Sequence, residues 1–465
     1  MSSVSANPAQ ALPAVMSPLS GQMLEFDEDE DLEVFSKDVN LMDGSPMNAS
    51  MPTSPASMIN QYKFEEEADA KDIFVTVDNP ESHVTALETF ITYRVVTKTT
   101  RSEFDSCEHE VRRRYQDFLW LKERLEETYP TLIINPLPEK FVMKGMVERF
   151  NDDFIETRRK ALHKFLNRIA DHPILSCHED FKVFLTAQAW ELTSHKKQGP
   201  GFLSRMGDTM RAVAASVRGV RNRPEEFTIM QEYVDSFGQK MVSLDKVAQR
   251  IVKEQKEYLE ELKEYGPVYT LWSGSEEELV EPLKGVAGCI DRCCRATEEQ
   301  ISHLSENLVP LLHEYVLCAD SVKAVLRRRD NIQAESEAKN DALANRKADR
   351  EALKESKDVG FVLGSLLGKN PEEARQQKEQ RLDSEINELK EEVERLEDKV
   401  ECANNALKGD WLQWESNMRS DIKAAFVNTA EKNIDYYEKC LAVWESFLAS
   451  QNTGHDVESS TGHGS

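Results

Sequence analysis

The chain has 465 residues, of which 31% are charged, and its formal net charge is −26. This length leaves room for two or three domains, because one hydrophobic core seldom grows past roughly 250 to 300 residues. The acidic balance excludes a general nucleic-acid binder, which needs a net basic face to displace counterions from phosphates. A site for a phosphorylated ligand would therefore have to be a local basic patch.

The cysteines and the hydropathy indicate where the protein works. The closest group of the eight cysteines, Cys289, Cys293 and Cys294, has no histidine set spaced for zinc, so we expect reduced structural thiols and no metal site. No apolar run approaches the roughly 18 to 20 residues of a membrane span, and the N-terminus lacks a basic region followed by an apolar core. These features predict a cytoplasmic protein that reaches a membrane only by recruitment.

Both ends of the chain are predicted to be disordered. Residues 1–70 contain 13 acidic and 2 basic residues, and a segment so rich in Ser, Pro, Met and Asn cannot bury enough apolar surface to order itself. We predict a disordered acidic arm over residues 1–67 and a disordered tail over residues 451–465. The acidic block at residues 25–33 either docks a partner or only keeps the chain soluble.

A small α+β domain is predicted over residues 68–190. Apolar side chains alternate from residue 73 to residue 77, and a second β-rich run covers residues 83–98 after Asn79-Pro80. A third strand ends at Arg114, and three strands followed by helices fit this class. The helices that we expect after the strands cover residues 118–125 and 151–171.

The third strand ends in Arg112-Arg113-Arg114 and is followed by Tyr115. The planar fork of an arginine matches the oxygens of a phosphate, and an aromatic ring beside it can pack against a sugar-like ring. The alternative is a solvated strand end whose arginines pair weakly with surface carboxylates.

The second predicted helix carries a charge on its apolar stripe. Arg158 falls on the side that the core residues occupy, so it needs either a carboxylate partner or a ligand phosphate. Arg159 and Lys160 leave this stripe, and we expect them to be solvated. The two histidines of this region, His163 and His172, are expected to be structural.

Three motifs together resemble the phosphoinositide-binding core of PX domains. They are Arg-Arg-Arg-Tyr-Gln-Asp-Phe at residues 112–118, Pro-Leu-Pro-Glu-Lys-Phe at residues 136–141 and Glu-Thr-Arg-Arg-Lys-Ala-Leu at residues 156–162. Their order is similar to that in the sorting nexins, most of all in the branch of sorting nexins 7 and 30.

The resemblance implies a role for each matched residue in binding phosphatidylinositol 3-phosphate. Arg114 would grip the 3-phosphate, Tyr115 would pack under the inositol ring, and Gln116 would line the pocket. Lys140 would meet the 1-phosphate. Arg158 would bind the ring hydroxyls and so favour a headgroup that is unsubstituted at positions 4 and 5.

Two segments are candidates for insertion into a bilayer. Phe141 and Val142 lie beside Lys140, and they either enter the membrane or cover the domain's own core. Residues 191–223 form a predicted linker with an amphipathic helix, which either lies in the membrane interface or docks on the next domain. The candidate apolar residues of this helix are Phe202, Leu203, Met206 and Met210.

Sustained heptads predict an all-α coiled-coil domain over residues 224–450. Three heptad sets give three rods of order 60 to 100 Å at 1.5 Å per residue. Gly266-Pro267 is expected to interrupt the first helix. The first heptad set consists of Phe227, Met230, Val234, Phe237, Met241, Leu244, Ala248, Ile251, Tyr258, Leu262 and Tyr265.

Three coiled-coil helices directly after a PX domain resemble a BAR domain, whose antiparallel dimer forms a curved six-helix body with a basic concave face. The resemblance implies a homodimer, or a heterodimer with another PX-BAR sorting nexin, on an anionic membrane. On the heptads alone, a coiled-coil spacer is the alternative. The candidate residues for the basic face are Lys323, Arg327, Arg328, Arg329, Arg346, Lys347 and Arg350.

The sequence contains no nucleophile elbow, metal cluster or paired carboxylates in a plausible pocket, so we expect no enzyme and no cofactor. The resemblance implies a peripheral protein on the cytosolic face of early endosomes that binds phosphatidylinositol 3-phosphate. As a BAR dimer it would sense or stabilise curved tubules for endosomal sorting, recycling and autophagy-linked protein transport. The alternative is a protein-protein scaffold whose PX-like fold does not depend on lipid.

Overall fold

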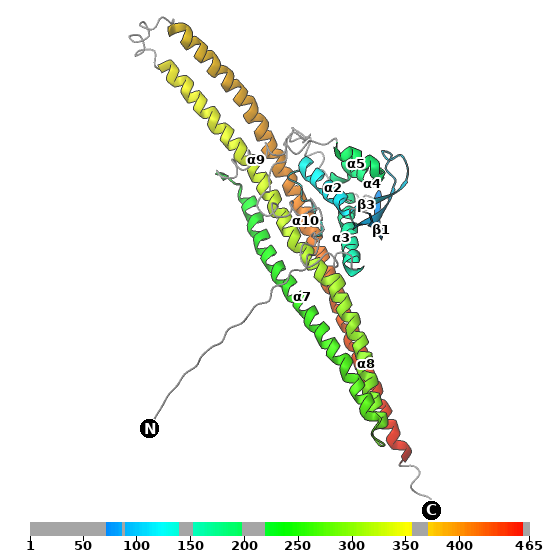
Figure 1. The fold of residues 1–465 in the computed structure, drawn as a ribbon. Coiled ribbons are helices and arrows are strands. Elements are labelled where there is room, and N and C mark those ends of the chain that lie inside the picture. Colours follow the sequence, from blue (N-terminus) through cyan, green and yellow to red (C-terminus); the bar gives the residue numbers. More distant parts are fainter. Residues whose placement is uncertain (1–70, 86–88, 139–151, 198–218, 356–370, 459–465) are drawn as a thin grey trace, which may run out of the picture. The chain divides into compact units, whose positions relative to one another are not determined.

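The computed structural model describes residues 71–85, 89–138, 152–197, 219–355 and 371–458. An α+β domain is followed along the chain by long helices (Figure 1), which confirms the expected fold class. Within these ranges, every helix is too short or too polar to cross a bilayer.

The α+β domain is built on an antiparallel sheet with strand order β1-β2-β3. A bulge between Asp78 and Glu81 lets β1 continue past Asn79-Pro80, where we expected it to stop. Asn79 takes a positive φ of 43° there, and Pro80 is tolerated because β1 is an edge strand. The strands are β1 (Ile73–Val84), β2 (Thr89–Thr99) and β3 (Glu108–Arg114).

Helix α3 (Asp152–Ala170) covers the outer edge of β1. The backbone N–H of Val77 donates to Nδ1 of His163 at 3.2 Å, and Nη1 of Arg159 donates to the Val77 carbonyl at 2.7 Å. Arg159 also pairs with Glu156, so the expectation that it is solvated was wrong. These side chains satisfy backbone groups that an open sheet edge would leave unpaired, and His163 is structural as expected.

Two further helices, α2 (Tyr115–Thr128) and α4 (Glu179–Thr186), pack with α3 on the sheet. Apolar side chains from all of these elements form one core. Its members include Val75, Val95, Phe118, Leu162, Phe165 and Phe184.

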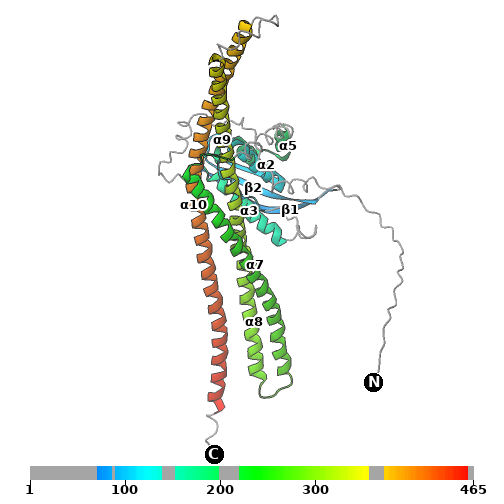
Figure 2. The same cartoon turned by 90° about the vertical axis from the view of Figure 1, so that its left-hand side faces the viewer.

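The all-α part contains three rods. One rod is α7, the second joins α8 to α9 through a π-helical turn at Leu304–Leu308, and the third is α10. Pro310 accounts for the turn. A proline has no N–H to donate to the carbonyl of residue 306, and its ring crowds the same carbonyl. In both views α9 and α10 lie side by side (Figure 1, Figure 2). The bounds are α7 (Glu225–Ser273), α8 (Val280–His303), α9 (Val309–Glu355) and α10 (Pro371–Glu458).

Two helix ends differ from expectation. Helix α7 runs through Pro267 to Ser273, although an internal proline costs about 3 kcal/mol. Helix α8 packs closely here, since a Cβ added to Gly266 would lie 3.5 Å from Cγ2 of Ile290, and this packing holds α7 helical. Helix α10 continues to Glu458, beyond the predicted start of the tail at residue 451.

The predicted heptad stripe of α7 is covered only in its first half. Val234, Phe237 and Met241 are buried, whereas four later members of the stripe are 43 to 57% exposed, and Ala248 and Leu262 are half-buried. The residues that follow Ile251 and Tyr258 in the sequence, Val252 and Leu259, are buried instead. Helix α7 therefore has two apolar stripes, and the second stripe, which we call the open α7 stripe, consists of Leu244, Ile251, Tyr258 and Tyr265.

A buried carboxylate joins the α+β domain to α10. Asp410 is 4% exposed and accepts hydrogen bonds from the backbone N–H of Ile133 and from Nε2 of His172, the latter at 2.7 Å. Nδ1 of His172 accepts from the N–H groups of Ile174 and Leu175, so the proton of a neutral imidazole must sit on Nε2. His172 is structural, as expected.

Ion pairs also join helix α3 to the rods. Lys164 lies 2.9 Å from Glu314, and Arg168 lies 2.6 Å from Asp421. Burial alone would raise the pKa of Asp421, but Lys164 and Arg168 bring that pKa below its ordinary value. Lys160, expected to be solvated, pairs with Glu306 at 3.1 Å. Helix α3 thus reaches α9, α10 and the turn before α9.

A double-mutant cycle on His172→Ala and Asp410→Ala tests the buried bond. We expect each single change to lower the free energy of unfolding by about 2 to 3 kcal/mol, and the two to couple by about 1 to 3 kcal/mol, because each leaves a buried polar partner unsatisfied. Urea unfolding of the four proteins measures this coupling.

The exposed pair Asp291 and Arg295 is the control, with both side chains about two-thirds solvent-accessible. Its coupling should stay below about 0.5 kcal/mol. Purely additive effects of His172→Ala and Asp410→Ala would contradict the buried bond.

Candidate functional site

The three consecutive arginines of β3 have three different surroundings. Arg112 reaches across the sheet, where Nε donates to Oγ1 of Thr92 at 2.9 Å and Nη2 donates to the Asn79 carbonyl at 2.8 Å. Nη1 lies 3.0 Å from Glu81. Arg112 therefore ties β3 to β1 across the intervening strand.

Arg113 is completely buried. Its Nε donates to the Phe184 carbonyl at 2.8 Å and its Nη2 donates to the Ala187 carbonyl, so the guanidinium satisfies carbonyls at the C-terminal end of α4. Burial lowers the pKa of Arg113 to about 10, which leaves it charged at neutral pH. This arginine is structural.

Arg114 stands at the N-terminal end of α2. Its guanidinium lies 3.2 Å from the centroid of the Phe90 ring, and its backbone N–H donates to Oδ2 of Asp117 at 2.7 Å. The positive end of the helix dipole and a guanidinium therefore occur at one place, which is a favourable arrangement for an anion. Tyr115 and the exposed Gln116 follow as the first helical residues.

Arg158 comes to the same place from α3. Its guanidinium lies 4.4 Å from the ring centroids of both Tyr115 and Phe154. It also bonds Tyr93, although burial is the larger effect and raises the pKa of that phenol to about 12. The structure thus brings together Arg114, Tyr115 and Arg158, which the sequence motifs had singled out.

The proline-rich stretch is anchored to this cluster, because the Tyr115 hydroxyl donates to the Pro138 carbonyl at 2.5 Å. Three aromatic contributors were missed from the sequence. Phe154 had a signal, since it lies one turn before Arg158 in α3, but Phe90 and Tyr93 of β2 had none beyond strand propensity. The predicted site residues Lys140, Phe141, Val142, Phe202, Leu203, Met206 and Met210 lie outside the described residues.

The predicted basic face on the rods is partly wrong. Arg329 is 1% exposed, and its Nε donates to Asn404 at 2.7 Å. Burial, followed by Arg223, lowers the pKa of Arg329 to about 10. Arg328 donates to the Pro130 carbonyl at 2.9 Å.

Successive helical residues point about 100° apart, so three adjacent arginines cannot share one face. Of these three, Arg327 alone is exposed. Further along α9, Lys347 and Arg346 are exposed, and Arg346 pairs with Glu385 at 3.2 Å. Arg350 is half-buried and pairs with Asp383 at 3.1 Å.

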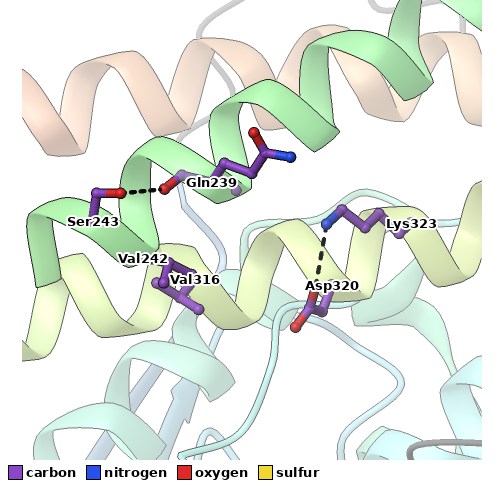
Figure 3. Close-up of a pocket in the computed structure, with 7 residues that line it drawn as sticks. Gln239, Val242, Ser243, Val316, Asp320 and Lys323 are labelled. Carbon is purple, nitrogen blue, oxygen red and sulfur yellow. Dashed lines mark hydrogen bonds and ion pairs between the residues drawn. The ribbon is translucent and has the colours of Figure 1, made fainter. Parts of the chain in front are cut away.

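A groove of about 330 Å³ lies between α7 and α9 (Figure 3). Gly238 permits the close approach of the two helices, since a Cβ there would lie 3.2 Å from Cβ of Ala319. Lys323, another candidate for the basic face, lies 3.6 Å from Asp320 and 3.3 Å from Asp235. Two carboxylates therefore compensate the charge of Lys323, which makes the groove a poor site for an anionic ligand.

No three His, Cys, Asp or Glu side chains are placed to hold a metal ion in the part of the chain that the structure covers. Cys289 and Cys294 are buried and Cys293 is half-buried, as expected for structural thiols.

The sheet, the α2 terminus with Arg114 and the three rods define a PX domain followed by a BAR-type helical domain. Family models agree, because the PX domain model matches residues 101–188 and the model described as Vps5 C terminal like matches residues 203–450. The second match covers more than half of the chain.

The chain belongs to the sorting nexin family, of the PX-BAR type. Human sorting nexin-7 is 61% identical over 419 residues, which cover 90% of this chain and 99% of the relative. Sorting nexin-30 of Xenopus tropicalis is 47% identical over 414 residues, which cover 89% of this chain and 84% of the relative. The expected branch of sorting nexins 7 and 30 is confirmed.

A solved structure shares the fold. The cryo-EM structure of the SNX-BAR Mvp1 tetramer superposes with a TM-score of 0.60 over 80% of this chain and 99% of that chain. Its sequence identity is 16%, so the likeness concerns the fold alone.

Arg113→Ala is expected to lower the free energy of unfolding by about 2 to 4 kcal/mol, because it leaves the buried carbonyl of Phe184 and the half-buried carbonyl of Ala187 without this donor. Arg113→Lys should recover only part of this loss, because a single ammonium cannot reproduce the two separate donors of the guanidinium. Lys98→Ala, at a side chain that is 67% exposed on the same sheet, is the control. Thermal unfolding measures all three, and an Arg113→Ala protein as stable as the control would refute the structural role.

Proposed function

We propose that this protein binds phosphatidylinositol 3-phosphate on the cytosolic face of early endosomes. The observation that carries the proposal is the meeting of Arg114, Tyr115 and Arg158 at the N-terminal end of α2. Membership of the PX-BAR sorting nexins supports the broader role, which is membrane-associated and belongs to endosomal trafficking. Sorting nexins of this type are generally not enzymes.

The chemistry of the cluster suits this headgroup. A 3-phosphate would receive the guanidinium fork of Arg114 at the positive end of the α2 dipole. The Tyr115 ring would pack under the inositol, and Gln116 would line the pocket. Arg158 already lies on the Tyr115 ring and would donate to the 4- and 5-hydroxyls.

Lys140 remains part of the proposal as the partner of the 1-phosphate. It follows Pro138 by two residues, and a chain can span at most about 7 Å between their Cα atoms. The Pro138 carbonyl accepts a hydrogen bond from Tyr115, so the chain two residues before Lys140 is anchored at the site, which supports this role. We further propose that Phe141 and Val142, and the face with Phe202, Leu203, Met206 and Met210, enter the bilayer.

The rods support a dimer, either of two copies or with another PX-BAR sorting nexin. The open α7 stripe is matched by an exposed apolar stripe on α10, and contiguous apolar surface of this kind marks an interface. We propose that the dimer senses or stabilises curved tubules for endosomal sorting, recycling and autophagy-linked transport. The α10 stripe contains Phe426, Ile434, Tyr437, Leu441, Trp444 and Leu448.

A protein-protein scaffold is the second candidate. It is favoured by the net charge of −26 and by the loss of Arg328 and Arg329 from the predicted basic face. In this case the rods would bind partner helices, and targeting would not depend on the headgroup.

Co-sedimentation with liposomes that contain or lack phosphatidylinositol 3-phosphate distinguishes the two candidates. We expect the wild type to bind only the 3-phosphate liposomes, and Arg114→Ala to lose at least about tenfold in affinity, because it removes a charge-assisted phosphate contact. Arg295→Ala removes one exposed charge from α8, outside the predicted basic face, and is the matched control. Binding that is indifferent to the headgroup, or equal in the two variants, would favour the scaffold.

Leu441→Asp is expected to break the dimer, because it places a charge in the α10 stripe, where Leu441 is 59% exposed in the single chain. Ser446→Asp makes the same charge change at an exposed position on the other side of α10. Light scattering after size exclusion measures the mass of the purified chain and of the chain co-expressed with a second PX-BAR sorting nexin. A dimer that survives Leu441→Asp in both preparations would show that the stripe is not the interface.

A further inference from the structure

Helix α5 (Ala189–Lys197) begins after the residues that the PX family model matches, yet it is packed against α2, the helix whose N-terminal end carries the candidate headgroup site. Its Leu192 is buried. Nε2 of His195 lies 2.6 Å from Oδ1 of Asp180 in α4, and the His195 ring meets the Trp120 ring of α2 edge-on at 5.9 Å. Helix α5 is therefore held against α2 and α4.

Asp117 connects α5 to the site. It occupies the third position of α2, where one carboxylate oxygen accepts the backbone N–H of Arg114 at 2.7 Å. The other oxygen accepts the ammonium of Lys196 from α5, which also lies 5.3 Å from the centroid of the Trp120 ring. Both partners of this ion pair are mostly buried, with 24% of the Lys196 side chain and 17% of the Asp117 side chain exposed.

The Asp117 carboxylate has opposite effects on the helix and on the ligand. A carboxylate at this position stabilises the first turn and holds the Arg114 backbone in its capping conformation. The same negative charge repels a phosphate at the Arg114 side chain, and in a partly buried site this repulsion is weakly screened. A neighbouring cation is needed to keep the first effect and cancel the second.

We infer that Lys196 is a positioning residue of the headgroup site, which neutralises Asp117 so that Arg114 and Arg158 face the phosphate without a competing carboxylate. This inference rests on the proposed function. It assigns α5 to the lipid-binding unit, with Lys196 acting through Asp117 and not on the ligand directly. The ligand chemistry concerned is a phosphate monoester on an inositol ring, either in a membrane or free in solution.

The test compares Lys196→Ala with Lys197→Ala in the full chain, because Lys197 is the next residue of α5 and is exposed. Isothermal titration with soluble inositol 1,3-bisphosphate reports the pocket alone, and phosphatidylinositol 3-phosphate liposomes add the membrane surface. We expect Lys196→Ala to lower the affinity for the soluble ligand by about threefold to tenfold, because it removes a nearby, partly buried charge. Lys197→Ala should lower this affinity by less than about twofold, because solvent and salt screen an exposed charge.

Three further variants separate positioning from folding. Lys196→Arg keeps the charge and should bind like the wild type. Asp117→Asn keeps an oxygen for the Arg114 N–H, so it should bind at least as tightly as the wild type, and Asp117→Asn with Lys196→Ala should recover most of the loss.

The outcomes are distinguishable. If the wild type binds the ligand but Lys196→Ala equals Lys197→Ala, or if the double variant is no better than Lys196→Ala, the inference alone fails. If the wild type binds neither the soluble ligand nor the liposomes, the proposed function fails and the inference fails with it.

Discussion

The buried carboxylate of Asp410 is the constraint that joins the two halves of this protein. A carboxylate that is 4% exposed must have donors, and both of its donors in the α+β domain, Ile133 and His172, come from loops that would otherwise face water. The apolar cores are shared in the same way, since Cys402 and Ala406 of α10 belong to the core of the α+β domain. Each domain therefore completes the other, and their stabilities are linked.

Helix α3 links this junction to the candidate headgroup site. Its N-terminal half carries Arg158 against Tyr115, and its C-terminal half carries Lys164 and Arg168 against α9 and α10. Burial raises the pKa of Tyr315, which keeps its hydroxyl protonated as a donor to Asp421 among these charges. A single helix thus fixes one wall of the site and the domain contact, so a change at one end of α3 has a direct physical route to the other.

The sequence was informative wherever a period decided the direction of a side chain. The stripe of α3 predicted that Arg158 faces inward, and the strand period separates Arg113 from its two neighbours, although the motif alone treated the three arginines as one patch. The helical period likewise separates Arg327 from Arg328 and Arg329, so the exposed basic face is smaller than predicted. Contacts between distant elements, such as Phe90 under Arg114 or Asp410 with His172, leave no periodic signal.

The heptads of α7 show the same limit in another form. A heptad states that a helix face is apolar, but it does not state which surface covers that face. After Met241, the residues of α7 that pack against the chain's other helices are shifted by one position in the heptad. Val252 and Leu259 are therefore covered, whereas Leu244 and Ile251 are not. Because α10 leaves a second apolar stripe open, water contacts two long stripes in the isolated chain. Their removal from water is a driving force for association that the monomer's own packing leaves unused.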